Sequence, residues 1–207
     1  NNTAVGYQSL VANTTGYSNT SVGYQAGDAI TTGNRNVLVG DSAGSNLTTS
    51  AGFTFVGFEA GKDQISGGQN TYFGFRAGYT HTGHSQQTML GFQARNIKGN
   101  GNASTAVGAY ASVNGSNQVA VGGNAQTNDG GTALGQSARS GSYATSLGMG
   151  AGSYSKLNNY SVHVGHDSGN NGQYSVAVGT DTLFSATSGS YYNVAVGNEA
   201  GYSLTSG

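Results

Sequence analysis

The sequence predicts an all-β fold, a parallel β-roll solenoid of about 13 short rungs. Three observations predict it: an apolar-Gly motif that recurs along the chain, columns of similar residues when the repeats are aligned, and turn-forming residues between them. The composition agrees, because 37 of 207 residues are Gly, none is Pro, and Tyr, Phe and Val favour strands. With 7% charged residues and a net charge of -1, the chain differs from typical disordered sequences.

The repeat is defined by an anchor glycine that follows an apolar residue. Seven successive anchors are 17 residues apart, and the later spacings are 14, 13, 13, 17, 14 and 18. We therefore interpret 1–207 as one repeat domain cut from a longer fibre, with regular 17-residue rungs over 1–107 and mixed 13–18-residue rungs over 108–207. The anchors are Gly6, Gly23, Gly40, Gly57, Gly74, Gly91, Gly108, Gly122, Gly135, Gly148, Gly165, Gly179 and Gly197.

Alignment on the anchor glycine assigns a role to each column. The residue before it is always Val, Leu or Phe, and the residue three before it is always Thr or Val. These positions lie two apart and so share one face of a strand, which we expect to fill the interior of the roll. The residue three after the anchor is always Ala, Ser or Thr, which predicts close packing. The glycine itself is expected to need positive φ or a close backbone approach.

The column two residues before the anchor points to the opposite face and is also mainly apolar. A strand that is apolar on both faces is usually buried on both. We therefore expect this column to pack against other copies of the chain, the alternative being a loop that folds back over it. The predicted trimer-interface residues are Leu38, Phe55, Tyr72, Met89 and His163.

The Asn-Thr-Ala-Val-Gly-x-x-Ala unit, seen at Asn2–Ser9, Asn102–Ala111 and Asn193–Ala200, resembles the head repeats of trimeric autotransporter adhesins. It is also similar to repeats of phage tail fibres, and the 17-residue spacing is closer to these. The resemblance covers essentially the whole chain. It implies a left-handed parallel β-roll, a homotrimeric fibre, an extracellular place on a cell or virion surface, and adhesion to a surface receptor such as a glycan or protein.

Two groups of linker residues are candidate receptor contacts. Tyr79, His81 and His84 lie in one turn, and Tyr191 and Tyr192 lie in the longest linker. Aromatic side chains on loops provide rigid contact area for sugar rings. The alternative is that they are ordinary exposed polar residues.

Two further patterns have a structural and a functional interpretation. His163 and His166 form an HxxH motif that could bind a transition metal on a threefold axis, but we favour a packed interface histidine and expect no metal or cofactor. The residues directly after the anchors form an aromatic column, which we interpret as a stacking ladder rather than a ligand site. The aromatic column contains Tyr7, Tyr24, Phe58, Phe75 and Phe92.

The residues two positions after the anchors include one expected ion pair. Glu59 and Arg76 are predicted to pair across neighbouring rungs.

Several function classes are not favoured. No catalytic set is visible, because the one carboxylate pair in a shared column, Asp167 and Asp181, is expected to be an exposed acidic edge. The scattered cations form no basic patch for nucleic acid, no apolar run approaches the ~18 residues of a membrane span, and there is no Cys for a disulfide.

The predicted function is a structural and adhesive fibre module that projects from a surface and contacts a receptor. One alternative is a passive spacer whose binding tip lies elsewhere. Another is ice binding through the Thr column, which we favour less because that column is expected to point inward.

Overall fold

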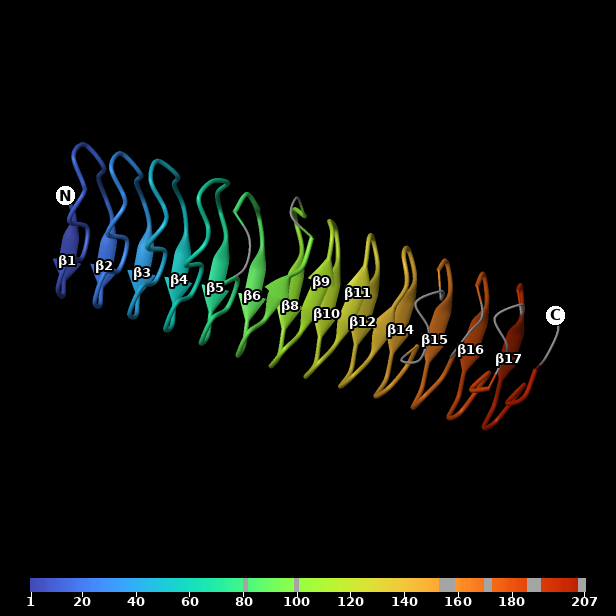
Figure 1. The fold of residues 1–207 in the computed structure, drawn as a ribbon. Helices are drawn as coiled ribbons and strands as arrows, with labels where there is room; N and C mark the ends of the chain where they lie inside the picture. Colours follow the sequence, from blue (N-terminus) through green and yellow to red (C-terminus); the bar gives the residue numbers. More distant parts are fainter. Residues whose placement is uncertain (80–81, 99–100, 153–158, 170–172, 186–190, 205–207) are drawn as a thin grey trace. The chain divides into compact units, whose positions relative to one another are not determined.

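A computed structural model describes residues 1–79, 82–98, 101–152, 159–169, 173–185 and 191–204 (Figure 1). All regular structure in these residues is β-strand, and they contain no helix. No helix that could cross a membrane is therefore found in the described part of the chain. The chain forms two compact units, Asn1–Tyr110 and Ala111–Gly207, each of which is a parallel β-solenoid.

The first unit contains one strand before each anchor glycine and a short extra strand. The strands pair in parallel in the order β1-β2-β3-β4-β5-β6-β8, and the register matches residues 17 apart, as in Phe55 opposite Tyr72. The 17-residue period of the sequence is therefore the length of one coil. The strands are β1 (Thr3–Val5), β2 (Thr20–Val22), β3 (Val37–Val39), β4 (Thr54–Val56), β5 (Thr71–Phe73), β6 (Thr88–Leu90), β7 (Arg95–Asn96) and β8 (Thr105–Val107).

The second unit has the same ladder and a second small sheet. Its anchor strands pair in the order β10-β12-β14-β15-β16-β17, while β9, β11 and β13 pair on the other side of the shorter coils. The strands are β9 (Ser112–Asn114), β10 (Val119–Val121), β11 (Gln126–Asn128), β12 (Thr132–Leu134), β13 (Arg139–Ser140), β14 (Thr145–Leu147), β15 (Val162–Val164), β16 (Val176–Val178) and β17 (Val194–Val196).

The anchor glycines turn the chain sharply after each strand. All thirteen have φ between 127° and 143°, a region that is open essentially to glycine alone. A Cβ on Gly40 would lie only 2.3 Å from the carbonyl oxygen of Gly57 in the next rung. Positive φ and close backbone approach, the two reasons that the sequence suggested, therefore apply together.

The two faces of the strands are reversed relative to the prediction. Leu38, Phe55 and His163 have no exposed surface, and Tyr72 and Met89 are 1% exposed, within a single chain. The prediction that this column faces other chains was therefore wrong, because it forms the core of each coil. The residue before the anchor faces outward instead, and Val5, Phe73 and Leu90 are 56%, 53% and 43% exposed.

The physical reason for the reversal is space that a second glycine column leaves inside the coil. A Cβ on Gly61 would lie 2.3 Å from the ring of Phe55, and one on Gly78 would lie 2.3 Å from the ring of Tyr72. The glycine four residues after the anchor thus gives the large inward side chains their room. The Phe55 and Tyr72 rings then stack at 4.6 Å with an interplanar angle of 2°.

The rest of the core contains small residues and amides beside large apolar side chains such as Phe53, Ile30 and Leu47. Of the ten alanines three residues after the anchors, all but Ala200 are fully buried, which confirms the predicted close packing. The column four residues before the anchor contains buried Asn side chains that bond from rung to rung. Asn36 Nδ2 donates to Asn19 Oδ1 at 3.1 Å, and Asn36 Oδ1 accepts from the backbone N–H of Phe53 at 3.0 Å. These bonds satisfy amides that would otherwise be costly to bury.

Candidate functional site

The first candidate site is the outward side of the anchor strands, which we call the outer face. It consists of the residues one and three positions before each anchor glycine. All of these are Thr, Val, Leu or Phe, with no charged or amide residue in any of the thirteen strands, although Gly and Ser are the commonest residues of the chain. Val37, Val119 and Val162, from the column three before the anchor, are 36–40% exposed. An exposed sheet face of this composition is typical of a contact surface.

The second candidate site is a pocket of about 210 Å³ in the first unit, which we call the arginine pocket. It is lined by Arg76, Tyr79, Gln93 and Arg95. The repeat explains the placement, because Arg76 and Gln93 are each the second residue after an anchor glycine in consecutive rungs. Both have positive φ at this corner, 53° and 52°. The backbone N–H of Gln93 donates to the carbonyl of Phe75 at 2.9 Å, which fixes the two rungs against each other.

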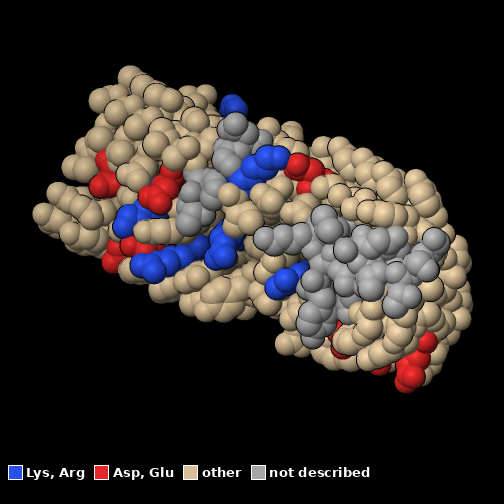
Figure 2. All heavy atoms as spheres, turned by 45° about the vertical axis from the view of Figure 1, so that its right-hand side comes forward, with Lys and Arg blue, Asp and Glu red and all other residues tan. Residues whose placement is uncertain are grey.

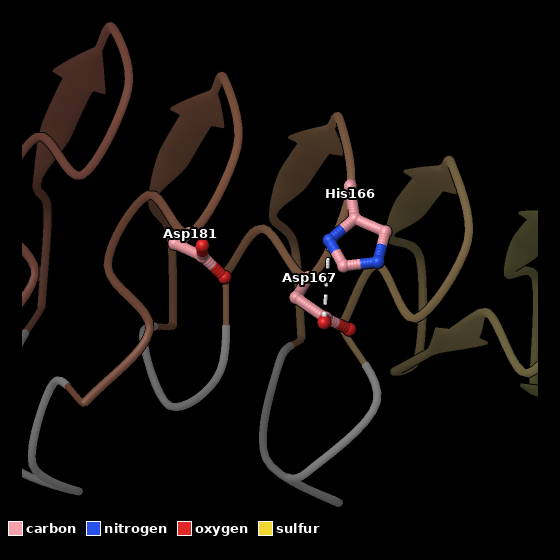
Figure 3. A group of neighbouring side chains, drawn as sticks. All are labelled: His166, Asp167 and Asp181. Atoms are coloured by element: carbon pink, nitrogen blue, oxygen red, sulfur yellow. Dashed lines mark ion pairs between the residues drawn. The ribbon is translucent and has the colours of Figure 1, made fainter.

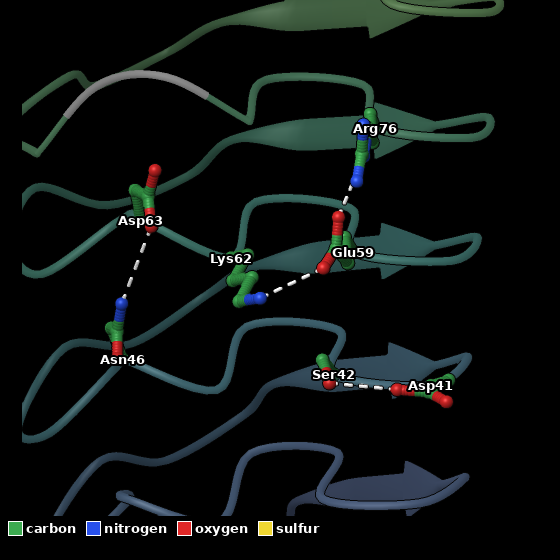
Figure 4. A network of polar contacts seen from close by, with 7 residues as sticks. All are labelled: Asp41, Ser42, Asn46, Glu59, Lys62, Asp63 and Arg76. Atoms are coloured by element: carbon green, nitrogen blue, oxygen red, sulfur yellow. Dashed lines mark hydrogen bonds and ion pairs between the residues drawn. The ribbon is translucent and has the colours of Figure 1, made fainter.

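Arg76 is held in place by Glu59 in the preceding rung. Its Nε donates to Glu59 Oε2 at 2.6 Å, and Lys62 Nζ donates to Glu59 Oε1 at 2.7 Å (Figure 4). The hydrogen bond from Lys62, followed by that from Arg76, lowers the pKa of Glu59 and outweighs the effect of burial. The predicted Glu59–Arg76 pair is thus confirmed, and the sequence analysis missed Lys62.

The arginine is also stacked on aromatic rings. The Arg76 guanidinium carbon lies 5.2 Å from the centroid of Tyr79, 5.4 Å from Phe75 and 5.9 Å from Phe58. Such cation–π contacts orient the planar guanidinium. The rings themselves stack, at 5.0 Å for Phe58–Phe75 and 5.2 Å for Phe75–Phe92, which confirms the predicted aromatic ladder.

Arg95, the other arginine of the pocket, has in the described part of the chain no carboxylate partner of the kind that Glu59 provides for Arg76. Within the described residues, no carboxylate lies within 4.0 Å of Arg95. Arg76 is paired with Glu59, whereas Arg95 has no carboxylate partner among the described residues. The pocket therefore combines an oriented guanidinium and an unbalanced one with an amide and a phenol. The chain as a whole has only 7% charged residues. Figure 2 shows blue cationic atoms with red acidic atoms nearby on a largely uncharged face.

The structure separates the first group of predicted receptor contacts. Tyr79 is half-buried and lines the arginine pocket. His84 is 2% exposed, with its Nε2 2.8 Å from the carbonyl oxygen of Lys98. The expectation that His84 is part of an exposed patch was therefore wrong, because the ring is enclosed by neighbouring coils. His81 lies outside the described residues.

In the second group, Tyr192 belongs to a tyrosine ladder that was not predicted from the sequence. Tyr191 and Tyr192 are 43% and 76% exposed, and Tyr192 stacks on Tyr174 at 5.2 Å. The ladder continues through Tyr160 to Tyr143, with 5.2 Å and 5.4 Å between successive centroids. The available signal was a tyrosine five residues before the anchor in four successive rungs. Tyr160 and Tyr174 each stack on a ring on both sides, so mainly their edges and hydroxyls remain for other contacts.

The two histidines of the HxxH motif do not form one site. His163 points into the core, where its Nδ1 lies 3.2 Å from Ser146 Oγ, and burial lowers its pKa to about 4. His166, beyond the glycine corner, is exposed. The favoured interpretation of His163 as a packed residue is confirmed, but it packs inside its own chain.

His166 instead lies beside two carboxylates (Figure 3). One ligand atom each from His166, Asp167 and Asp181 lies within 4.8 Å of the others, and His166 Nδ1 is 3.3 Å from Asp167 Oδ2. Asp181 donates its backbone N–H to the carbonyl of His166 at 3.0 Å, so the acidic residues are neighbours in one column. One nitrogen and two oxygens could hold a divalent cation, with water completing the coordination. Only the spacing of these three half-exposed or exposed groups points to such a site.

The fold and these surfaces define the class of the chain as a parallel β-solenoid. Comparison with protein-family models gave no match, and comparison with curated protein sequences also gave none.

Proposed function

We propose that the chain is a structural and adhesive segment of an extracellular homotrimeric fibre, in which three copies pack through their outer faces. The observation that carries the proposal is the outer face itself, whose two columns contain only Thr, Val, Leu and Phe. Covering these side chains removes apolar surface from water, at roughly 25 cal/mol per Å². The fibre has no catalytic role in this proposal and needs no cofactor.

Further copies of the same chain are the partners that fit this face best. Parallel rungs repeat at about 4.8 Å, so a second copy presents contact positions at the same interval. Closed symmetric assembly would bring each outer face toward a common axis. The number three comes from the resemblance of the repeats to trimeric adhesins and phage fibres, and the place on a cell or virion surface has the same basis.

Light scattering coupled to size-exclusion chromatography tests this assembly. We expect about three times the 20.7 kDa of one chain. The double variant Phe73→Glu/Leu90→Glu should shift the protein to monomers, because it places charges on the outer face. Both residues are exposed within one chain, so the variant should still fold. Gln86→Glu, an exposed position in the same rung as Leu90 but off the outer face, is the matched control. A monomeric wild-type protein would contradict the proposal.

The reversed strand faces also favour ice binding as a second candidate. The Thr column, expected to point inward, lies on the outer face, with Thr3, Thr71 and Thr88 exposed. Phe73 and Leu90 interrupt a flat Thr and Val array, which is why we place this function second. Thermal hysteresis measured on the purified protein distinguishes the two, since a trimer with a covered outer face should show none.

An adhesive role, rather than that of a passive spacer, is supported by the arginine pocket. A spacer needs only stacked rungs, and the pocket residues Gln93 and Arg95 take no part in the ion pairs or ring stacks of the described residues.

A further inference from the structure

We propose that the arginine pocket binds an acidic saccharide, that is, a terminal sugar residue carrying a carboxylate or a sulfate group. The inference rests on the proposed adhesive function and names the class of receptor. The site consists of Arg76, Tyr79, Gln93 and Arg95 in the first unit.

The two guanidinium groups supply the recognition of the anion. Guanidinium is planar and donates paired hydrogen bonds that match carboxylate and sulfate oxygens. Arg76 is already oriented, because its Nε is bound to Glu59 and its plane lies near the Tyr79 and Phe75 rings. A pre-oriented group loses less conformational entropy when the ligand binds. Arg95, with no carboxylate within 4.0 Å among the described residues, supplies the charge that the anion neutralises.

The remaining two residues fit the neutral part of a sugar. The Gln93 amide offers both a donor and an acceptor to hydroxyl groups, and the Tyr79 hydroxyl offers the same. The pocket volume of about 210 Å³ is below the roughly 300–1,000 Å³ of sites for drug-sized ligands. It therefore suits one sugar residue and not a long segment of a chain.

The charge distribution argues against a polyanion such as nucleic acid. The first unit contains five cationic and four acidic side chains, and two of the cations share Glu59. Proteins that bind nucleic acid present several phosphate-contacting cations along the path of the strand. Here only Arg76 and Arg95 line the pocket, so the anion that fits is a single charged group on a small, hydroxylated molecule.

Isothermal titration calorimetry of the full chain tests the inference. The probes are the methyl glycoside of N-acetylneuraminic acid, galactose 6-sulfate, neutral methyl β-galactoside and a short oligothymidylate. We expect at least one of the two acidic sugars to bind with a Kd between about 10 μM and a few mM, and the neutral sugar at least about tenfold more weakly. Arg95→Gln and Gln93→Ala should each weaken acidic-sugar binding, Arg95→Gln by at least about tenfold.

Arg35→Gln is the matched control, because Arg35 lies over the Tyr17 ring outside the pocket in the same unit. It should leave the affinity unchanged. Absence of binding by both acidic sugars, equal affinity for the neutral sugar, an unaffected Arg95→Gln variant, or tighter binding of the oligothymidylate would each overturn the inference. Light scattering on the same samples separates this result from the proposed function, since a trimer that binds no acidic sugar keeps the fibre and rejects only the receptor class.

Discussion

At the scale of single residues, His163 shows how a titratable group in the core of a β-solenoid affects the stability of the fold. The ring is fully buried, its Nδ1 is 3.2 Å from Ser146 Oγ, and its Nε2 has no hydrogen-bond partner among the residues that the structure describes. A Cβ on Gly169 would lie 1.9 Å from the ring, so glycine is what allows the imidazole to fit. The site is built for a neutral side chain.

This burial predicts a pH-dependent stability. The folded-state pKa of His163 is lowered from 6.5 to about 4, so the unfolded chain takes up the proton first. Neutral His163 therefore leaves the free energy of unfolding at its full value above about pH 6.5. This stability is lost as the pH falls from 6.5 toward 4. At roughly 1.4 kcal/mol per pKa unit, the loss approaches about 3 kcal/mol.

Urea unfolding at several pH values measures this effect as the difference between the wild type and His163→Leu, which cancels the other titrating groups. The wild type should lose stability on acidification relative to the variant. A difference that stays constant between pH 7 and pH 4 would show that the ring is not buried as a neutral group.

At the scale of the rung, the anchor glycine allows two neighbouring coils to approach closely, because it has no Cβ. We expect Gly40→Ala to destabilise the protein by about 3 kcal/mol or more, because it combines a φ of 136° with a Cβ 2.3 Å from the Gly57 carbonyl oxygen. Gly83→Ala is the control, since the nearest atom to its Cβ is 3.6 Å away and no positive φ is needed. Its effect should be within about 0.5 kcal/mol. Thermal unfolding measures both, and similar changes would contradict this account of the corner.

The same rung shows how far the sequence could be interpreted. The period, the parallel register, the glycine corner, the small buried column and the aromatic ladder all followed from spacing and residue size, and each is confirmed. The direction of the strand faces did not follow, because both faces are apolar and a period of two cannot say which one is inside. The deciding residues were Gly61 and Gly78, whose missing Cβ atoms make room for Phe55 and Tyr72.

Other features were hidden for different reasons. The buried Asn19 and Asn36 resemble turn formers in sequence, and only the stacking of coils shows that they bond to each other. The arginine pocket joins residues from separate rungs, and Arg95 lies four residues after its anchor, where the two preceding rungs have Gly61 and Gly78. Tyr79 was singled out for its aromatic ring, whereas its position beside two arginines depends on the three-dimensional coil.

At the scale of the whole molecule, the reversal moves the expected self-association from one side of the strand to the other without removing its physical reason. The argument that a doubly apolar strand must be covered twice still applies. One cover is the coil's own interior, and in our proposal the other is provided by neighbouring copies at the outer face. The light-scattering experiment with Phe73→Glu/Leu90→Glu is the decisive test at this scale.

The in-register pairing of coils has a consequence for how such a gene can change. Because each 17-residue coil of the first unit pairs residue for residue with the next, duplication or loss of one whole coil leaves every remaining side chain in phase. Such an event would lengthen or shorten the stack by about 4.8 Å, whereas a one-residue insertion within a strand would exchange inward and outward side chains. Selection could therefore adjust the length of the solenoid in steps of one coil. The arginine pocket, which one pair of coils forms, would stay unchanged.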